Sequence, residues 1–402
     1  MQTLVQPKHI GTVTLAAMLS LACGAAGTVA PGPAAPDASA PGAAAAHRVV
    51  IASCMVRAAA TLRFNGSIYA RLGDVAVEKS FGTADAAGRI PISNHTQFNI
   101  ASAGKMFTAV AIGLLVDRGA VEFDAPISRY LPGLNGEVGA ITVAQLLNHT
   151  SGLGDYFHPS NRAAIDAAVT ATDLLPLALA GAHEFPAGSR RAYSNAGFVV
   201  LGAIIEKVSG LTYPQFVKKE ILTPLGMSNT RFDAEQGAQA MTLMSPEGQL
   251  PQARPAPLQA RASPAGGMFS TPSDVSLFLT ALNQGQLLKR ETVRALLLGR
   301  PDPSGGGGLY GYGFNIRDDA PRRVGHGGGA PGANAEVALY PASGRQLIAL
   351  SNYDPPAASR MVTVLEKVLF AADPEPACRT ALADPELLAP MTQLHPPLLR
   401  KQ

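Results

Sequence analysis

The chain has 402 residues, of which 47% are hydrophobic and 15% are charged, and its formal net charge is +3. This composition indicates a globular protein with enough length for one large domain or two subdomains. The lysines and arginines are scattered, and no basic run alternates with aromatic residues. A nucleic-acid partner is therefore not expected.

The N-terminus has the pattern of an export signal. Lys8 lies just before an apolar stretch at residues 10–22, which is followed by small residues and is too short for a membrane span. Cys23 follows a partial lipobox, in which Ser20 stands where leucine is usual. We expect residues 1–27 to be an export signal and the protein to be periplasmic or secreted. Lipidation of Cys23 would add a membrane tether.

Two further segments lie outside the expected folded domain. Residues 28–47 are mostly small residues and proline, a composition that cannot build a core and predicts a disordered linker. Residues 371–402 are rich in proline and predict a loose tail, which leaves residues 48–370 as the folded domain. The two remaining cysteines, Cys54 and Cys378, either form a disulfide that ties the start of the domain to its end or stay as free buried thiols.

Strand patterns occur at both ends of the domain, and helical patterns lie between them. The first part predicts a helix at residues 47–60 and a hairpin of strands at 67–71 and 75–79 about a Gly-Asp turn. Helical periodicity returns at residues 161–181, 196–209, 213–221 and 273–284, strand patterns at 312–316, 323–326, 335–340 and 346–351, and a last helix at 361–370. The expected fold class is α/β (α+β). It has an antiparallel sheet built from the N- and C-terminal segments, flanked by helices, and a mostly helical middle subdomain at about 116–300.

Ser102 lies three residues before Lys105, at the start of a long apolar run that ends near Gly119. Residues at i and i+3 share one face of a helix, so the hydroxyl and the amine can meet. A helix that is apolar on all sides is buried, and burial lowers the proton affinity of a lysine. Lys105 would then be a neutral base at neutral pH. The alternative is an N-cap serine followed by a lysine that extends to the surface.

A second motif, Tyr193-Ser194-Asn195, follows a turn signal and precedes a helical stretch. A tyrosine at a turn can direct its phenol toward a reacting serine, and a phenolate favoured by a neighbouring ammonium can take the serine proton. Asn195 could bond to Lys105 and to a substrate amide. The alternative is an ordinary turn tyrosine with an asparagine cap.

A third motif, His326-Gly327-Gly328-Gly329, follows a strand pattern. Glycines within a strand mark a close approach of the backbone, and such a strand can supply half of an oxyanion hole. The alternative is a plain glycine loop. The other histidines lack the spacing of metal ligands, and the glycine runs lack the strand–turn–helix context of a nucleotide site, so no metal or cofactor is expected.

In this order, the three motifs resemble those of the serine β-lactamase-like, penicillin-recognising hydrolases. The likeness is to the branch that holds class C β-lactamases, D-alanyl-D-alanine carboxypeptidases, D-aminopeptidases and β-lactamase-like esterases. Connecting phrases at residues 146–153, 224–230, 265–271 and 325–332 are also similar to that family. The resemblance covers roughly residues 60–355 and implies a serine hydrolase.

The resemblance also implies a role for each motif residue. Ser102 would be the nucleophile that forms an acyl-enzyme, and Lys105 and Tyr193 would share the proton transfers. The backbone N–H groups of Ser102 and Gly329 would form the oxyanion hole. The residues expected to bind and orient the substrate are Asn195, His326, Gly327 and Gly328.

The third motif departs from the family pattern, in which a lysine comes first and a hydroxyl residue second. Here these positions hold His326 and Gly327. Histidine is mostly neutral at pH 7, so the change weakens the case for β-lactams and peptidoglycan stems, which carry a carboxylate, and favours neutral esters or other amides. If the charge of His326 matters, activity should titrate at roughly pH 6 to 7.

The sequence therefore predicts an exported serine hydrolase that acts through an acyl-Ser102 intermediate on a small-molecule ester, amide or peptide. One alternative is a β-lactamase or D-alanyl-D-alanine carboxypeptidase. Another is a catalytically silent protein that binds a peptide or cell-wall fragment. The loops around residues 155–185 and 231–262 are expected to set specificity.

Overall fold

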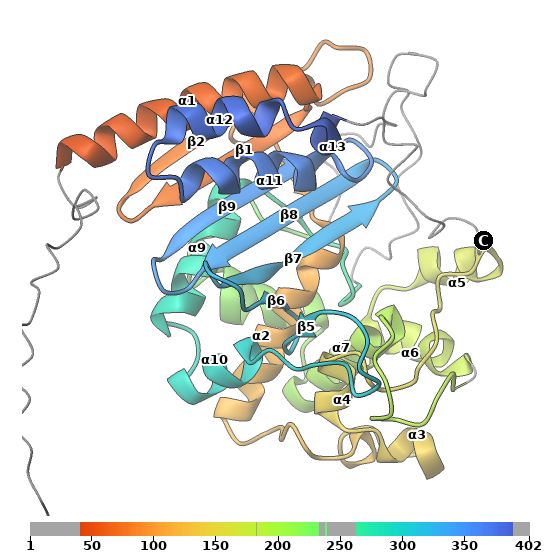
Figure 1. Ribbon diagram of the computed structural model, residues 1–402. Helices are drawn as coiled ribbons and strands as arrows, with labels where there is room; N and C mark the ends of the chain where they lie inside the picture. Colours follow the sequence, from red (N-terminus) through yellow and green to blue (C-terminus); the bar gives the residue numbers. More distant parts are fainter. Residues whose placement is uncertain (1–40, 182, 233–237, 239–262, 389–402) are drawn as a thin grey trace, which may run out of the picture. The chain divides into compact units, whose positions relative to one another are not determined.

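The computed structural model describes residues 41–181, 183–232, 238 and 263–388 (Figure 1). The expected export signal at residues 1–27, with Cys23, lies outside these described residues. So do most of the expected linker and most of the expected specificity loop at residues 231–262.

Within the described part of the chain, seven strands form one antiparallel sheet in the order β2-β1-β9-β8-β7-β6-β5. The strands are β1 Gly66–Leu72, β2 Val75–Phe81, β5 Leu309–Tyr310, β6 Asn315–Arg317, β7 Arg323–Ala330, β8 Ala333–Tyr340 and β9 Arg345–Ser351. Gly66 of β1 pairs with Ser351 of β9, so the N-terminal hairpin joins the C-terminal strands directly. This sheet and its flanking helices confirm the expected fold class.

The sequence overestimated one strand. Of the expected strand at residues 312–316, only the last part belongs to β6, and residues 312–314 form a turn between β5 and β6. The Gly313 N–H donates to the Leu147 carbonyl at 3.0 Å, and the Tyr312 N–H donates to the Leu296 carbonyl at 2.8 Å. These two backbone groups therefore bind helical segments and do not join the ladder of the sheet.

Three helices cover one face of the sheet: α1 Pro41–Leu62, α11 Ala357–Leu369 and α12 Pro374–Leu382 (Figure 1). Their buried apolar residues, such as Ile51, Met55 and Met361, form one core with the strands beneath them. Cys54 of α1 and Cys378 of α12 form a disulfide with their Cα atoms 6.0 Å apart. This finding confirms the disulfide alternative.

Two boundaries predicted from the sequence are wrong. The expected linker extended to residue 47, but α1 begins at Pro41, because an alanine-rich run has a high helix propensity. The expected tail began at residue 371, but α12 and α13 (Pro385–Leu388) lie within it. Cys378 and Ala381 are buried in the core beneath α12, so this part of the tail belongs to the folded domain.

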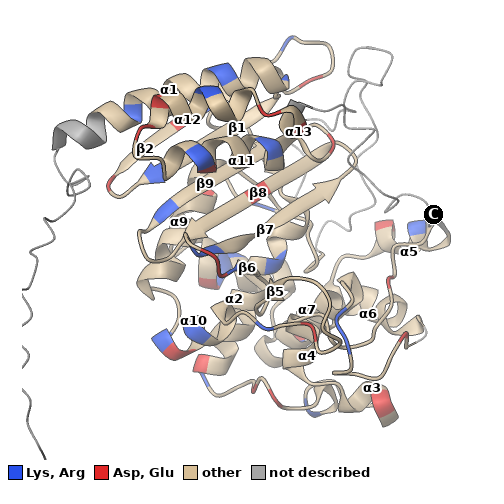
Figure 2. Ribbon diagram, in the orientation of Figure 1, with Lys and Arg blue, Asp and Glu red and all other residues tan. Residues whose placement is uncertain are grey.

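The other face of the sheet packs against the helical part of the chain. Its helices are α2 Lys105–Asp117, α3 Gly136–Ala140, α4 Val143–Leu147, α5 Arg162–Ala167, α6 Ala171–Ala180, α7 Asn195–Ser209, α8 Tyr213–Val217, α9 Pro272–Gln284 and α10 Arg290–Leu297. A short two-stranded sheet, β3 Phe98–Asn99 with β4 Phe269–Ser270, leads into α2. Charged residues are spread over the outer helices and loops, as Figure 2 shows. The second, larger core has α2 and α7 within it.

Candidate active site

Ser102 lies in a short 3₁₀-helix, Ala101–Gly104, that runs directly into α2. Neither N-terminus is capped by a side-chain hydrogen bond, so Ser102 is not the N-cap that the alternative interpretation required. Lys105 is the first residue of α2 and is 0% exposed, so it does not extend to the surface either. Both parts of that alternative are wrong.

The Lys105 amine has three polar neighbours, all oxygen atoms. It donates to Asn195 Oδ1 at 2.8 Å and to the Ala265 carbonyl at 2.6 Å, and Nζ lies 3.2 Å from Ser102 Oγ. Burial lowers the pKa of Lys105 well below its ordinary value, and the charge of Asp155 offsets this only in part. The amine is thus driven toward its neutral form.

The neutral amine has a defined orientation at this site. It carries two N–H donors and one lone pair, and carbonyl-type oxygens can only accept hydrogen bonds. Asn195 Oδ1 and the Ala265 carbonyl therefore take the two N–H groups. The remaining lone pair is directed to the Ser102 hydroxyl, which is the arrangement of a base with its nucleophile.

The second motif lies at the start of α7. Ser194 is the N-cap and its hydroxyl accepts from the Gly197 N–H at 3.1 Å, which leaves the Asn195 side chain free to meet Lys105. The Asn cap of the alternative interpretation is therefore wrong. Tyr193, just before the cap, is 51% exposed, so this side of the site is open to solvent.

Tyr193 lies over the Lys105 amine, which is 4.7 Å from the centre of its ring. The ordinary pKa of a tyrosine, about 10, already favours the phenol at neutral pH, and the part of Tyr193 that faces the protein raises this pKa further, opposed by a hydrogen bond with Ser102. The phenol is therefore favoured over the phenolate that the sequence interpretation invoked. A protonated Tyr193 can donate a hydrogen bond or a proton beside Ser102.

The third motif is part of β7, where side chains alternate between the two faces of the sheet. A Cβ at Gly328 would lie 2.1 Å from the Ile100 carbonyl, so only glycine lets the strand approach the turn that holds Ser102. A Cβ at Gly327 would instead meet Glu336 Oε2 at 3.2 Å. The structure thus brings Gly328 against the Ser102 turn, with Gly329 next to it along β7, while Gly327 faces another neighbour.

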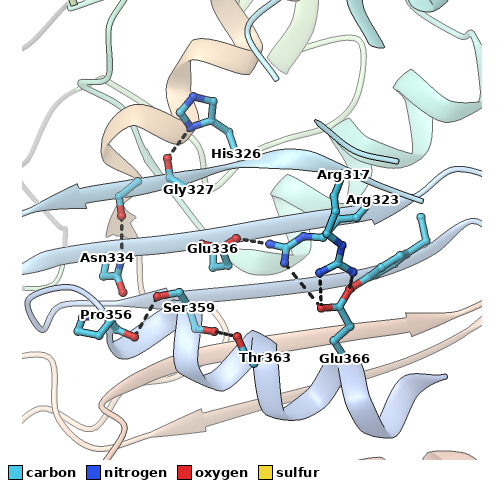
Figure 3. Close-up of polar contacts among 12 residues, drawn as sticks. Arg317, Arg323, His326, Gly327, Asn334, Glu336, Pro356, Ser359, Thr363 and Glu366 are labelled. Carbon is cyan, nitrogen blue, oxygen red and sulfur yellow. Dashed lines mark hydrogen bonds and ion pairs between the residues drawn. The ribbon is translucent and has the colours of Figure 1, made fainter. Parts of the chain in front are cut away.

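The ring of His326 is buried, and both of its nitrogens have partners inside the protein. Nε2 lies 2.9 Å from the Tyr310 hydroxyl, and Nδ1 lies 2.5 Å from the Gly327 carbonyl, the contact drawn in Figure 3. Burial lowers the pKa of His326 to about 3. The expectation that His326 would titrate at roughly pH 6 to 7 is therefore wrong.

The sequence interpretation missed the segment that supplies the Ala265 carbonyl. The Thr108 hydroxyl donates to the Pro264 carbonyl at 2.7 Å, and the Tyr213 hydroxyl donates to Thr108 at the same distance. Next to this, Gly266 has φ +139°, and a Cβ there would lie 2.4 Å from the Ala101 carbonyl. The segment at residues 264–266 is thus held against both Lys105 and the Ser102 turn. A backbone carbonyl has no sequence signature, although this segment lies in a phrase that resembles the family.

Among the described residues, no group of three or more His, Cys, Asp or Glu side chains is arranged to hold a metal ion. The polar groups around Ser102 are an amine, a phenol, an amide and backbone groups. We call Ser102, Lys105, Tyr193 and Asn195 the reaction centre. Its chemistry is that of a serine nucleophile with an adjacent neutral base.

Comparisons with known proteins agree with this chemistry. Penicillin-binding protein 4* of Bacillus subtilis is 30% identical over 316 residues, which cover 72% of this chain and 68% of that protein. Esterase EstB of Burkholderia gladioli is 32% identical over 181 residues, 41% of this chain and 46% of that protein. The structure of D-amino acid amidase from Ochrobactrum anthropi SV3 matches with a TM-score of 0.67 at 25% identity, covering 84% of this chain and 99% of that one. The beta-lactamase family model matches residues 68–369, so the chain belongs to the β-lactamase family and is a serine hydrolase.

Proposed function

We propose that this protein is an exported serine hydrolase that acts through an acyl-Ser102 intermediate on an ester or a small amide or peptide. The observation that carries the proposal is the position of Lys105 Nζ, 3.2 Å from Ser102 Oγ, with its two other contacts made to oxygens that only accept. A buried neutral amine in this orientation can take the proton of the serine as the hydroxyl attacks.

Acylation follows from the groups present. Ser102 Oγ attacks the substrate carbonyl carbon while its proton passes to Lys105 Nζ, and the N–H groups of Ser102 and Gly329 stabilise the resulting oxyanion. The tetrahedral intermediate then collapses, and the bond from carbon to the leaving group breaks. The Tyr193 phenol gives its proton to the leaving group and regains one from the Lys105 ammonium. Water then attacks the acyl-enzyme, and Lys105 and Tyr193 take the proton from the water and return one to Ser102 Oγ, which releases the acid and free Ser102.

The third motif points to the substrate class. A lysine at position 326 would supply a permanent cation for a substrate carboxylate, but His326 is held neutral and both ring nitrogens are bonded inside the protein. This favours neutral esters and amides over β-lactams and D-alanyl-D-alanine stems. The similarity to an esterase and to a structure of an amidase with L-phenylalanine amide bound supports the same class.

The similarity to penicillin-binding protein 4* keeps a β-lactamase or D-alanyl-D-alanine carboxypeptidase as the second candidate. A silent binding protein is less favoured, because Ser102, Lys105 and Tyr193 are brought together with a base oriented toward the nucleophile. Export is supported by the Cys54–Cys378 disulfide, since such bonds persist in oxidising compartments.

The test is hydrolysis of p-nitrophenyl acetate and of nitrocefin by the mature protein, beside Ser102→Ala. We expect ester hydrolysis that Ser102→Ala abolishes, together with labelling of Ser102 by a fluorophosphonate probe. Fast nitrocefin turnover without ester cleavage would favour the second candidate instead. Absence of labelling, or labelling that survives Ser102→Ala, would favour a binding protein.

A further inference from the structure

Beside the reaction centre, three buried side chains form a continuous hydrogen-bonded chain. His149 Nε2 lies 3.1 Å from the Tyr310 hydroxyl, and the same hydroxyl lies 2.9 Å from His326 Nε2. The three residues are 1%, 5% and 4% exposed, respectively. They come from the segment after α4, from β5 and from β7, so the chain joins three separate parts of the fold.

The two ends of the chain determine the direction of every hydrogen bond in it. His149 Nδ1 accepts from the Ser194 N–H at 3.2 Å, so in the neutral ring the proton is on Nε2 and is donated to Tyr310. His326 Nδ1 faces the Gly327 carbonyl, which can only accept, so its proton is on Nδ1 and Nε2 accepts from Tyr310. The sequence of donors is therefore His149, then Tyr310, then His326.

This direction also keeps both histidines neutral. A second proton on His149 would place Nδ1–H against the Ser194 N–H, donor to donor. A second proton on His326 would turn Nε2 into a donor toward Tyr310, whose own proton would then have no acceptor in the chain. Adding a proton at either end thus breaks a buried hydrogen bond.

His149 is also the residue that holds Tyr193 in place. Its carbonyl accepts from the Ala192 N–H at 3.0 Å and its Nδ1 accepts from the Ser194 N–H, so the residues on both sides of Tyr193 are bound to it. The two rings are packed with their centres 4.3 Å apart. His149 has φ +64°, in the left-handed region that costs a non-glycine residue energy, and such strain is kept where the surroundings hold it for a purpose.

We propose that His149 and Tyr310 are positioning residues for Tyr193, and that the His149–Tyr310–His326 chain fixes the phenol beside Ser102 and Lys105. His149 contacts the ring of Tyr193, Tyr310 fixes the orientation of His149, and His326 anchors Tyr310 to β7. None of the three needs to touch the substrate. This inference rests on the proposed function, because it assigns Tyr193 a role in the proton transfers at Ser102.

The first test is the tautomer of each histidine in the wild-type protein. Nitrogen NMR of ¹⁵N-histidine-labelled protein, assigned with His149→Asn and His326→Gln, should show both rings neutral at pH 7 with opposite tautomers. The proton should lie on Nε2 in His149 and on Nδ1 in His326. The same tautomer in both rings, or a protonated ring at pH 7, would overturn the chain. This measurement does not depend on enzymatic activity.

The second test is kinetic and uses Tyr310→Phe. We expect kcat for p-nitrophenyl acetate to fall roughly tenfold with KM changed less than about threefold, because a displaced proton donor affects the reaction more than binding. His149→Asn, which suits a positive φ but removes the ring and the bond to Tyr310, should lose at least as much. The matched control is Tyr340→Phe, since Tyr340 is 1% exposed and donates to Glu366 at 2.7 Å on the other face of the sheet.

The control should lose thermal stability but keep kcat within about twofold. If Tyr310→Phe loses stability and keeps kcat as the control does, the chain is only structural and the inference is wrong. Failure of the proposed function is seen separately, as wild-type protein that neither cleaves esters nor is labelled at Ser102. If Ser102 is labelled at the same rate in the wild-type protein and in Tyr310→Phe, the positioning role is contradicted and the proposed function still stands.

Discussion

The polar groups on the two sides of the sheet around strand β7 differ in their charge. On the side toward α11, Arg323 pairs with Glu336 of the neighbouring strand β8, and Arg317 and Arg323 pair with Glu366 of the helix (Figure 3). On the face toward α2, the polar groups around Ser102 include Lys105 and His326, and burial drives both toward their neutral forms.

The difference lies in the partners that each face provides. We call the four residues on the first face the arginine–glutamate cluster. Burial would raise the pKa of Glu366, but hydrogen bonds from Arg317 and Tyr340 and the nearby arginine charges outweigh it and hold the pKa below its usual range. The hydrogen-bond partners of Lys105 are carbonyl-type oxygens and a hydroxyl, not a carboxylate, and the charge of Asp155 offsets the desolvation of the ammonium only in part. Glu366 therefore keeps its charge among the arginines, although burial raises the pKa of its neighbour Glu336, whereas burial drives Lys105 of the reaction centre toward its neutral form.

The largest effect should come from removing the base of the reaction centre. Lys105→Met keeps an apolar side chain in the core but removes the amine that takes the Ser102 proton. We expect kcat/KM for p-nitrophenyl acetate to fall by about 10³-fold or more, with the free energy of unfolding changed by less than about 2 kcal/mol. Retention of activity within about tenfold would assign the role of base to another group.

A substitution in the arginine–glutamate cluster should instead lower stability and leave activity unchanged. Glu366→Gln removes the carboxylate that Arg317 and Arg323 share, but Arg323 keeps Glu336 and the partly exposed Arg317 keeps Asp319, so the free energy of unfolding should fall by about 1 to 2 kcal/mol while kcat stays unchanged. Asp166→Asn is the control, because Asp166 pairs with Arg162 where both side chains are about half exposed, and it should cost less than about 0.5 kcal/mol. Denaturant unfolding measures both variants. A loss of kcat in folded Glu366→Gln would mean that the two faces are coupled through β7.

His326 and Glu366, on opposite sides of the sheet, should affect the free energy of unfolding in different pH ranges. His326 has a pKa of about 3 in the folded protein against 6.5 as its ordinary value, so its contribution to stability is full above pH 6.5 and is lost as the pH falls toward 3. The loss from His326 between pH 7 and pH 5 should be about 2 kcal/mol. The lowered pKa of Glu366 acts only below its ordinary value of 4.5. The pKa of the buried His149 is also well below its ordinary value, so His326→Gln should reduce the loss of stability between pH 7 and pH 5 without abolishing it. Denaturant unfolding at both pH values measures this, and an unchanged loss would contradict the buried neutral state of His326.

The sequence predicted the reaction centre more fully than its supports. Ser102 and Lys105 are three residues apart, so local helical geometry already places them together, and the motif order added Tyr193. His149 and Ala265 lie within the family-like phrases at 146–153 and 265–271, but neither these phrases nor the sequence around Tyr310 indicated a role at the site, because that role depends on which atoms the fold brings into contact. The charge state of His326 also depended on burial that its neighbours in sequence do not reveal.

The same limit explains the errors in the fold. The strand-and-helix order was enough to predict the sheet, since the alternation and periodicity are local patterns. The proline-rich composition after residue 371 indicated a tail, but Pro374 stands in the first turn of α12, where proline is tolerated. The contact that makes this segment part of the domain is the bond from Cys378 to Cys54, 324 residues away in the sequence.

The smallest effect on kcat is expected at Gly327, which is next to Gly328 in β7 but faces the opposite side of the sheet. Gly327→Ala adds a Cβ that would lie 3.2 Å from the end of the Glu336 side chain, which can shift, so kcat should stay within about threefold. Gly328→Ala is the matched comparison, because its Cβ would lie 2.1 Å from the Ile100 carbonyl and would push β7 away from the Ser102 turn. Kinetics of the two variants side by side, each checked for thermal stability, measure this contrast. Equal losses of kcat would show that β7 does not separate the faces at these positions, and that Gly327 also lies against the reaction centre.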